Sequence, residues 1–298
     1  MISKLSILIP TYNKVCLGLV ESLQAQASLL SDFHYEIIVA DDGSTDNSTI
    51  EANKAINKLP NCQYIERSIN IGRAAIRNFL AQEAKYAWLL YIDSNMSVVS
   101  DDYIDKYHSC KEYDVIYGGY KVDRNQPQLK GNLRYIFECA AQQNEDYTLR
   151  QNNPYADFHT SNFVIKRNIM LTHPFDEQFK KYGYEDVLFG KTLKEYNIKI
   201  EHIDNVLGYD NFASNYSFIL KTEESLHTLY QFRDEVQGYS KIIRYANLLE
   251  RWHVSCICKK LFPLLSLGIK ARLTGNKPSI FLFNVYKLMY YISLSLKK

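Results

Sequence analysis

Apolar runs alternate with helical patterns along the first hundred residues. The run at 88–92 has no polar face, which is typical of a strand covered on both sides. Helical spacing is clearest where Val15, Leu19, Val20 and Leu23 recur on one face. This alternation predicts an α/β fold with a doubly wound, mainly parallel sheet. The predicted strands are residues 5–9, 35–40, 62–65 and 87–92, and the predicted helices are 15–23, 46–59 and 72–83.

The pattern changes along the second half of the chain. A fifth strand is predicted at 114–119, where two glycines allow close backbone approach. Residues 123–153 are polar and predict a loop and a helix. From residue 222 the pattern is helical, with helices expected at 223–237 and 240–258. We therefore expect a domain at 1–222 and a helical C-terminal extension at 223–298.

Acidic residues stand where two of the predicted strands end. Asp41 and Asp42 follow the second strand, and Asp93 follows the fourth. Right-handed winding brings both carboxyl ends to one edge of the sheet, where ligands bind in open α/β folds. Turn chemistry alone explains one such acid. Several acids at one edge indicate a site for ribose hydroxyls, a base N–H or a divalent cation. Neither GxGxxG nor GxxxxGKS occurs, so a dinucleotide fold and a P-loop are not supported.

Charge is distributed unevenly along the chain. The 298 residues carry a net charge of +2. Residues 240–298 contain eleven Lys and Arg against the single acid Glu250, which gives +10. The remaining 24 basic and 32 acidic residues give −8. The chain is thus an acidic body with a basic tail.

The six cysteines and the apolar segments bear on location. No CxxC pair or zinc spacing occurs, which favours reduced thiols and a cytoplasmic protein. The first residues lack the features of a signal peptide. Asn284 and Lys287 interrupt the longest apolar stretch, which argues against a membrane span. The tail at 240–298 either lies on the inner face of a membrane as a peripheral anchor, or packs back on the body or forms a homodimer contact. No motif supports nucleic acid as a partner.

Four segments carry a resemblance to a known family. They are 6–13 (SILIPTYN), 37–46 (IIVADDGSTD), 70–78 (NIGRAAIRN) and 91–95 (YIDSN). In order and spacing, over about the first 230 residues, the chain resembles a family 2 glycosyltransferase with the GT-A, Rossmann-like fold. The resemblance implies a nucleotide-binding half at 1–100 and an acceptor half at 101–222.

The same resemblance implies where the nucleotide sugar binds. Thr11 and Tyr12 would flank the base, and Asp41 or Asp42 would hold the base or the ribose. Arg77 would lie near the base or the diphosphate. The implied nucleotide-sugar residues are Pro10, Thr11, Tyr12, Asp41, Asp42, Arg77 and Asp93.

The family's DxD element is present with one departure. Asp93 stands at its first acid, but Asn95 replaces the second. The resemblance implies Mn²⁺ or Mg²⁺ as cofactor, held by oxygen ligands that offset charge on the leaving diphosphate. Asn95 can coordinate without charge, so the affinity for the metal should fall. Where the family often has a later His, this chain has Tyr209 and Asp210, and His202 lies too early. The expected metal ligands are Asp93, Asn95 and Asp210.

Glu185 and Asp186 match the family's ED motif at the start of a predicted helix. Acids there also favour the helix dipole, which is a purely structural explanation. The resemblance implies Asp186 as the general base and Glu185 as an acceptor-binding or orienting group, both catalytic. Tyr182 and Tyr184 would form an aromatic wall against an acceptor sugar.

The expected function is therefore that of an inverting glycosyltransferase. It would move a sugar from a nucleotide-sugar donor, a UDP-sugar by family preference, to a glycan or lipid-linked acceptor hydroxyl in surface polysaccharide synthesis. The alternative is a catalytically impaired nucleotide- or glycan-binding scaffold of the same fold. Asn95 and Tyr209 decide between the two alternatives, because both stand where the family often has a metal ligand.

Overall fold

The computed structural model describes residues 1–141, 146–156 and 158–296. The chain forms two compact units, each built from separate segments. Residue 222, the predicted domain boundary, lies inside helix α9 (Asn215–Gln231). The division at 222 remains a prediction. The first unit is Met1–Asp123, Asn144–Lys180 and Phe189–Asn211, and the second is Arg124–Gln143, Lys181–Leu188 and Phe212–Lys298.

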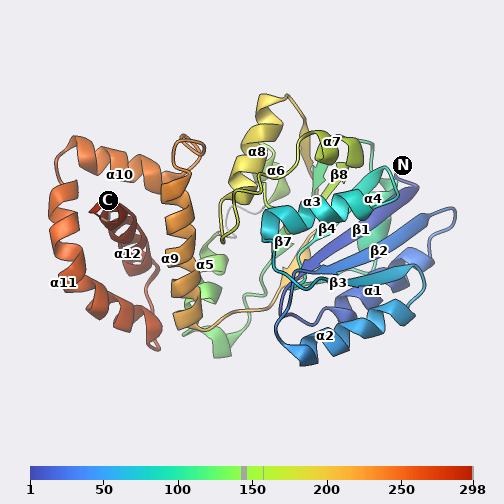
Figure 1. The fold of residues 1–298 in the computed structure, drawn as a ribbon, viewed down its shortest axis with the longest axis horizontal. Helices are drawn as coiled ribbons and strands as arrows, with labels where there is room; N and C mark the ends of the chain where they lie inside the picture. The colour runs from blue at the N-terminus through green and yellow to red at the C-terminus, as the bar shows by residue number, and fades with distance from the viewer. Residues whose placement is uncertain (142–145, 157, 297–298) are drawn as a thin grey trace. The chain divides into compact units, whose positions relative to one another are not determined.

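A seven-stranded sheet in the order β3-β2-β1-β4-β8-β6-β9 forms the centre of the first unit (Figure 1). Only β8 runs antiparallel to its neighbours, which confirms the mainly parallel sheet. Its strands are β1 (Lys4–Thr11), β2 (His34–Asp41), β3 (Cys62–Glu66), β4 (Trp88–Ile92), β6 (Val115–Tyr117), β8 (Asn162–Lys166) and β9 (Ile200–His202). A smaller sheet contains β5 (Met96–Ser97), β10 (Leu207–Tyr209) and β7 (Tyr120–Lys121).

Helices cover both faces of the larger sheet (Figure 1). α3 and α7 pack together, as do α1 and α4. The side chain of Asp46 accepts a hydrogen bond from the Ser48 N–H at 3.1 Å and so caps α2, within the helix predicted at 46–59. The helices of this unit are α1 (Leu17–Ser28), α2 (Asn47–Lys54), α3 (Arg73–Glu83), α4 (Tyr103–Ser109), α6 (Tyr147–Arg150) and α7 (Arg167–Thr172), with short 3-10 turns at η1 (Ala55–Lys58) and, in the second unit, η2 (Pro127–Leu129) and η4 (Leu294–Leu296).

All five positions of β4 are buried, as the apolar run at 88–92 predicts. Tyr91 stacks on Phe163 of β8 with ring centroids 4.9 Å apart. The Tyr91 hydroxyl donates to the backbone oxygen of Arg77 at 2.9 Å, so its polar end is satisfied inside the core. β4 thereby connects the centre of the sheet to α3.

A buried carboxamide organises the loops beyond β6. Asn162 Oδ1 accepts hydrogen bonds from the hydroxyls of Tyr103 and Tyr107 at 2.6 and 2.8 Å. Its Nδ2 donates to the backbone oxygens of Gly119 and Asn205. A Cβ on Gly118 would clash with the backbone oxygen of Asn205, so the predicted close backbone approach at the paired glycines is confirmed.

Burial keeps the imidazole of His202 neutral, and both of its ring nitrogens are hydrogen-bonded. Its Nδ1 accepts a hydrogen bond from Arg150 Nε at 3.2 Å, and its Nε2 donates to the backbone oxygen of Pro154 at 2.9 Å. Arg150 is itself buried. Burial is the main cause that lowers the pKa of His202 from 6.5 to about 4. A structural role thus explains this residue.

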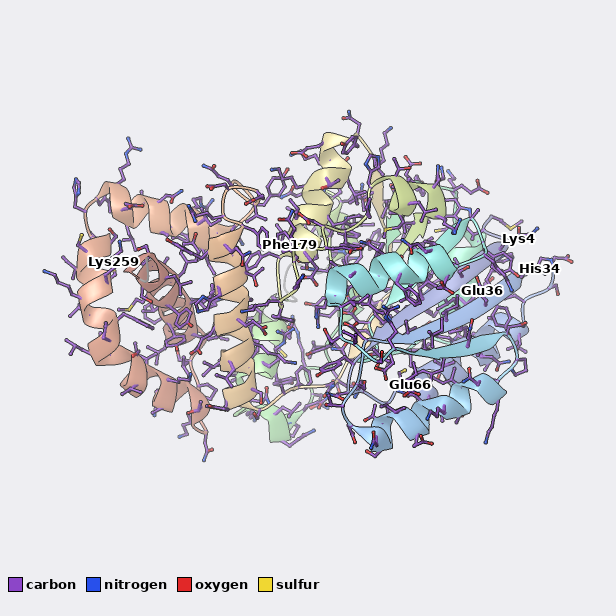
Figure 2. The ribbon with its side chains drawn as sticks, in the orientation of Figure 1. Lys4, His34, Glu36, Glu66, Phe179 and Lys259 are labelled. Carbon is purple, nitrogen blue, oxygen red and sulfur yellow. The ribbon has the colours of Figure 1, made fainter. Side chains whose placement is uncertain are left out.

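The depressed pKa of His202 predicts a pH-dependent stability. As pH falls from 6.5 towards 4, the unfolded chain binds the proton first, so the free energy of unfolding decreases over that window. His202→Gln should flatten this dependence in urea denaturation measured across the window. His34→Gln, at an exposed residue of β2 (labelled in Figure 2), should leave it unchanged. Equal pH dependence of His202→Gln and the unsubstituted protein would contradict this assignment.

The second unit is helical. In Figure 1, α12 lies inside the frame formed by α9, α10 and α11, which it contacts. The helix predicted at 240–258 begins as expected after Ser240, but its predicted end is wrong. The helix ends at Arg251, the chain turns at His253, whose φ is 59°, and a new helix begins at Ser255. The helix predicted at 223–237 begins earlier, after the capping residue Ser214. The other helices of this unit are α5 (Leu133–Ala141), α10 (Lys241–Arg251), α11 (Ser255–Thr274) and α12 (Ile280–Ser293), and α8 (Glu185–Glu195) begins here and continues in the first unit.

The helices within residues 1–141, 146–156 and 158–296 are mostly short or carry charged residues. None of the helices there combines the length and the apolar character that crossing a bilayer needs.

Candidate active site

The carboxyl ends of β1, β2 and β4 meet at one edge of the larger sheet. The parallel register pairs Thr11 with Asp41, and the Asp42 N–H donates to the Thr11 backbone oxygen at 2.8 Å. β4 pairs with β1 on its other side, so Asp93 follows its strand at the same edge. The predicted gathering of Asp41, Asp42 and Asp93 at one sheet edge is confirmed by this topology.

Asp41 is fully buried and fixes the turn after β2. Its Oδ1 accepts from the Ser44 N–H at 2.7 Å, and its Oδ2 accepts from the Tyr64 hydroxyl at 2.5 Å. Burial, and then Asp41 itself, raise the pKa of Tyr64, so this hydroxyl stays protonated and remains a donor. Asp41 therefore has protein partners for both oxygens.

Asp42 holds the loop before α3. Its two carboxylate oxygens accept from the backbone N–H groups of Ile71 and Gly72 at 2.8 and 3.0 Å. Burial raises the pKa of Asp42, although these two donors oppose that shift. Gly72 has φ +93°, and a Cβ there would approach the Lys180 backbone oxygen to 2.9 Å, so the loop requires glycine.

Arg77 and Asp93 form an ion pair at this edge. Arg77 Nη2 lies 2.8 Å from Asp93 Oδ1, and the Arg77 side chain is 2% exposed while that of Asp93 is 23% exposed. The guanidinium also lies over the Phe175 ring at 5.6 Å. Within the described residues, Asp93 Oδ2 accepts no hydrogen bond. The pair thus leaves one carboxylate oxygen of Asp93 available to a ligand.

The expected metal ligands lie just outside strands, Asp93 and Asn95 between β4 and β5, and Asp210 directly after β10. β5 and β10 pair antiparallel, with Tyr209 opposite Met96. Asn95 immediately precedes β5 and Asp210 immediately follows β10, so each is the chain neighbour of one member of this pair. Asp93, Asn95 and Asp210 offer only oxygen donors, a set that fits Mg²⁺ or Mn²⁺. Within the described residues no group of three or more His, Cys, Asp and Glu could hold a metal, so the Asn95 amide would have to contribute.

Tyr209 is a packing residue. Its side chain is buried, and its ring meets that of Tyr120 edge to face at 6.2 Å. Asp210 is exposed. Of the two residues found where the family often has a His, Asp210 is therefore the available oxygen donor.

The residues expected to bind the acceptor belong to the second unit. Asp186 Oδ1 accepts from the Val187 N–H at 2.8 Å in the first turn of α8, and Glu185 is buried. Gly183 and Tyr184 both have positive φ, of 100° and 69°. Positive φ is costly for a bulky residue, so this loop is held in a strained conformation.

That loop is tied to α9. Thr228 Oγ1 donates to the Tyr182 backbone oxygen at 3.2 Å, and a Cβ on Gly183 would meet the Ser225 side chain at 2.7 Å. The ring of Tyr184 packs against the core formed by α9, α10 and α12. Burial raises the pKa of Tyr184. Tyr184 thus has a packing role, and its role towards an acceptor remains a prediction.

Sequence reasoning missed three residues at the sheet edge. Asn13, with φ 49°, accepts the Thr45 N–H at 2.8 Å and so joins the loops after β1 and β2. Tyr64 donates to Asp41, as described. The Arg67 guanidinium lies 4.5 Å over the Phe79 ring and attracts Asp42. Asn13 lies inside the motif segment 6–13, so that segment could have indicated it as a site residue. No pattern in the sequence indicated Tyr64 or Arg67.

A cavity of about 470 Å³ lies beside α3 in the first unit. Its lining contains none of the predicted site residues, so the cavity is not the predicted donor site. The lining residues are Asn70, Ile71, Ala75, Phe79, Gln82, Glu177 and Lys180.

The fold is that of the GT-A glycosyltransferases. A mannosyltransferase of Pyrobaculum calidifontis, solved in complex with GDP-Man and Mn²⁺, superposes with a TM-score of 0.60 at 13% identity, covering 98% of this chain and 86% of the other. The chain belongs to glycosyl transferase family 2, whose sequence model matches residues 6–171, more than half of its length. The predicted family and fold class are thereby confirmed.

Curated relatives are much longer proteins. The chain is 24% identical to the chondroitin synthase of Escherichia coli over 240 residues, which is 70% of this chain and 35% of that protein. It is 38% identical to the poly(ribitol-phosphate) beta-glucosyltransferase of Bacillus spizizenii over 112 residues, or 37% of this chain and 17% of that protein. The chain thus spans about a third or less of the length of these relatives.

Proposed function

We propose that the protein is an inverting glycosyltransferase that uses a nucleotide-sugar donor. The observation that carries the proposal is the Arg77–Asp93 pair at the sheet edge where β1, β2 and β4 end. A buried guanidinium beside a partly exposed carboxylate suits a diphosphate and its counter-cation. Family membership adds the expectation of sugar transfer.

The nucleotide would bind along the loops at this edge. Tyr12 is exposed and is assigned to stack on the base, with Pro10 and Thr11 shaping the turn beneath it. Asp42 keeps slight exposure, whereas Asp41 has none. Asp42 is therefore assigned to the ribose or the base, and Asp41 to holding the turn.

A divalent cation fits the oxygen donors Asp93, Asn95 and Asp210, and when bound it would offset charge on the diphosphate. Arg77 sets the orientation of Asp93. Asp186 is assigned as the base that accepts the proton of the acceptor hydroxyl. The hydroxyl oxygen bonds to the anomeric carbon while the bond from that carbon to the diphosphate breaks, so the nucleoside diphosphate leaves and the configuration inverts. Glu185 is assigned to orient the acceptor.

The proposed donor is a UDP-sugar, and the proposed acceptor is a glycan or lipid-linked hydroxyl in surface polysaccharide synthesis. Support comes from relatives named as chondroitin synthase and poly(ribitol-phosphate) beta-glucosyltransferase. We place the reaction on the cytoplasmic side, because all six cysteines are free thiols.

Nucleotide binding tests the donor half of the proposal. Isothermal titration with UDP, GDP and CDP, each with and without Mn²⁺, should show UDP bound most tightly and the affinity raised by the metal. Substitution of the exposed Tyr12 by alanine should weaken binding of UDP by about 10-fold or more, since stacking on a base contributes about 1–3 kcal/mol. The matched control is Tyr196→Ala, at another exposed tyrosine. Absence of nucleotide binding would overturn the proposal.

A further inference from the structure

Helix α11 exposes an apolar face that the fold does not use. Ile257, Leu261, Leu264, Leu265 and Leu267 are all exposed, with Leu264 at 77% and Leu267 at 79%. Their spacing sets them on one half of the helix, together with the two basic residues Lys260 and Arg272. These seven residues are named here the α11 outward face.

The opposite half of α11 supplies its packing. Cys258 packs with the core of α9, α10 and α12. Phe262, Ile269 and Leu273 pack with Phe218 and the neighbouring side chains of α9 and α12. α11 is therefore already packed within its unit, and the residues of its outward face take no part in that packing. A contiguous apolar patch of this kind indicates an interaction surface.

Large aromatic residues flank α11 in the sequence. Trp252 precedes the helix and is 65% exposed, and Phe281 follows it at the start of α12 and is 77% exposed. In Figure 1 the turns at the two ends of α11 form two corners of the helical unit. Aromatic rings near the ends of an amphipathic helix are typical of segments that lie in a membrane interface.

The positive charge of this region favours an anionic partner. Residues 240–298 carry +10, with Glu250 as the single acid. Lys270 is paired with Glu223 at 2.9 Å, but within the described residues neither Lys259 nor Lys260 of the same helix forms an ion pair; Lys259 is labelled in Figure 2. A second copy of this chain would bring the same positive charge and be repelled. An anionic bilayer attracts each basic residue near its surface.

We propose that the α11 outward face binds the surface of a bilayer containing anionic lipid. The helix lies in the plane of the membrane, with its leucines in the acyl boundary and Lys260 and Arg272 at the headgroups. Membrane binding by this face is a property additional to the proposed reaction and does not depend on it.

The test is co-sedimentation of the full chain with vesicles. One set contains phosphatidylcholine and phosphatidylglycerol in equal parts, and the other contains phosphatidylcholine alone. The variant L264E/L267E places two charges on the outward face. The control L29E/L171E adds the same charge at two exposed leucines of the first unit. Light scattering and circular dichroism show that each variant is folded and report its oligomeric state.

The unsubstituted chain and the control should sediment with the anionic vesicles, and much less with phosphatidylcholine alone. L264E/L267E should lower the partition coefficient by about 100-fold, since two apolar side chains no longer enter the bilayer. Equal sedimentation of the two variants, or equal sedimentation on the two kinds of vesicle, would overturn the proposal. A dimer that L264E/L267E dissociates would also overturn it, because a second copy would then cover the face.

Discussion

Asp186→Asn should lower the rate of sugar transfer by about 10² to 10⁴, the usual contribution of a general base. An asparagine oxygen can still accept the Val187 N–H at the start of α8, so the first turn of the helix is retained. The change removes the basic group and leaves the local shape. The measurement is release of UDP from a UDP-sugar, with titration of UDP binding alongside.

The matched control for this prediction is Asp234→Asn. Asp234 lies in the same unit, its side chain is 82% exposed, and no role in the reaction is assigned to it. It should leave the rate unchanged. If Asp186→Asn releases UDP as fast as the unsubstituted protein, Asp186 is only a helix-capping acid and the catalytic assignment fails.

Substitutions in the Arg77–Asp93 pair should lower both the free energy of unfolding and the affinity for the nucleotide. Asp93→Asn removes the carboxylate that a nearly fully buried guanidinium contacts at 2.8 Å. Breaking a buried pair from one side costs about 3 kcal/mol or more of folding free energy. Arg77→Met combined with Asp93→Asn should be less destabilised than the sum of the two single changes, with a coupling of about 1–3 kcal/mol. All three variants should lose nucleotide binding, because the proposed diphosphate site is gone.

Urea denaturation of the four proteins gives the coupling. The same cycle on Lys166 and Asp114, paired at 2.9 Å with side chains 35% and 40% exposed, is the control. Its coupling should stay below about 1 kcal/mol, because exposed pairs contribute little. A coupling for Arg77 and Asp93 no larger than that of the control, or UDP binding retained in the double variant, would contradict the role given to this pair.

The sheet and its edge could be predicted because their signals are local. The run at 88–92 is apolar throughout, and Asp93 follows it directly, so strand and site residue are read from adjacent positions. The same holds for β2 and Asp41. Parallel winding then determines the shared edge without further information.

What the carboxylates bind could not be predicted, because their partners lie far away in the sequence. Asp42 accepts from Ile71 and Gly72, 29 and 30 positions later. The packing of Tyr184 depends on helices α9, α10 and α12, which carry no signal at residue 184 itself. The end of α10 was missed for a different reason. His253 takes a left-handed conformation although neither Gly nor Pro marks the turn.

The central claim is an inverting transfer from a nucleotide sugar. It is tested most directly by proton NMR of the sugar first released when the protein acts on UDP-α-glucose or UDP-α-N-acetylglucosamine with Mn²⁺, with water as the acceptor. The account predicts that the β-anomer appears before mutarotation mixes the two forms, and that Asp186→Asn slows its appearance. First release of the α-anomer, or UDP binding with no sugar released from either donor, would contradict it.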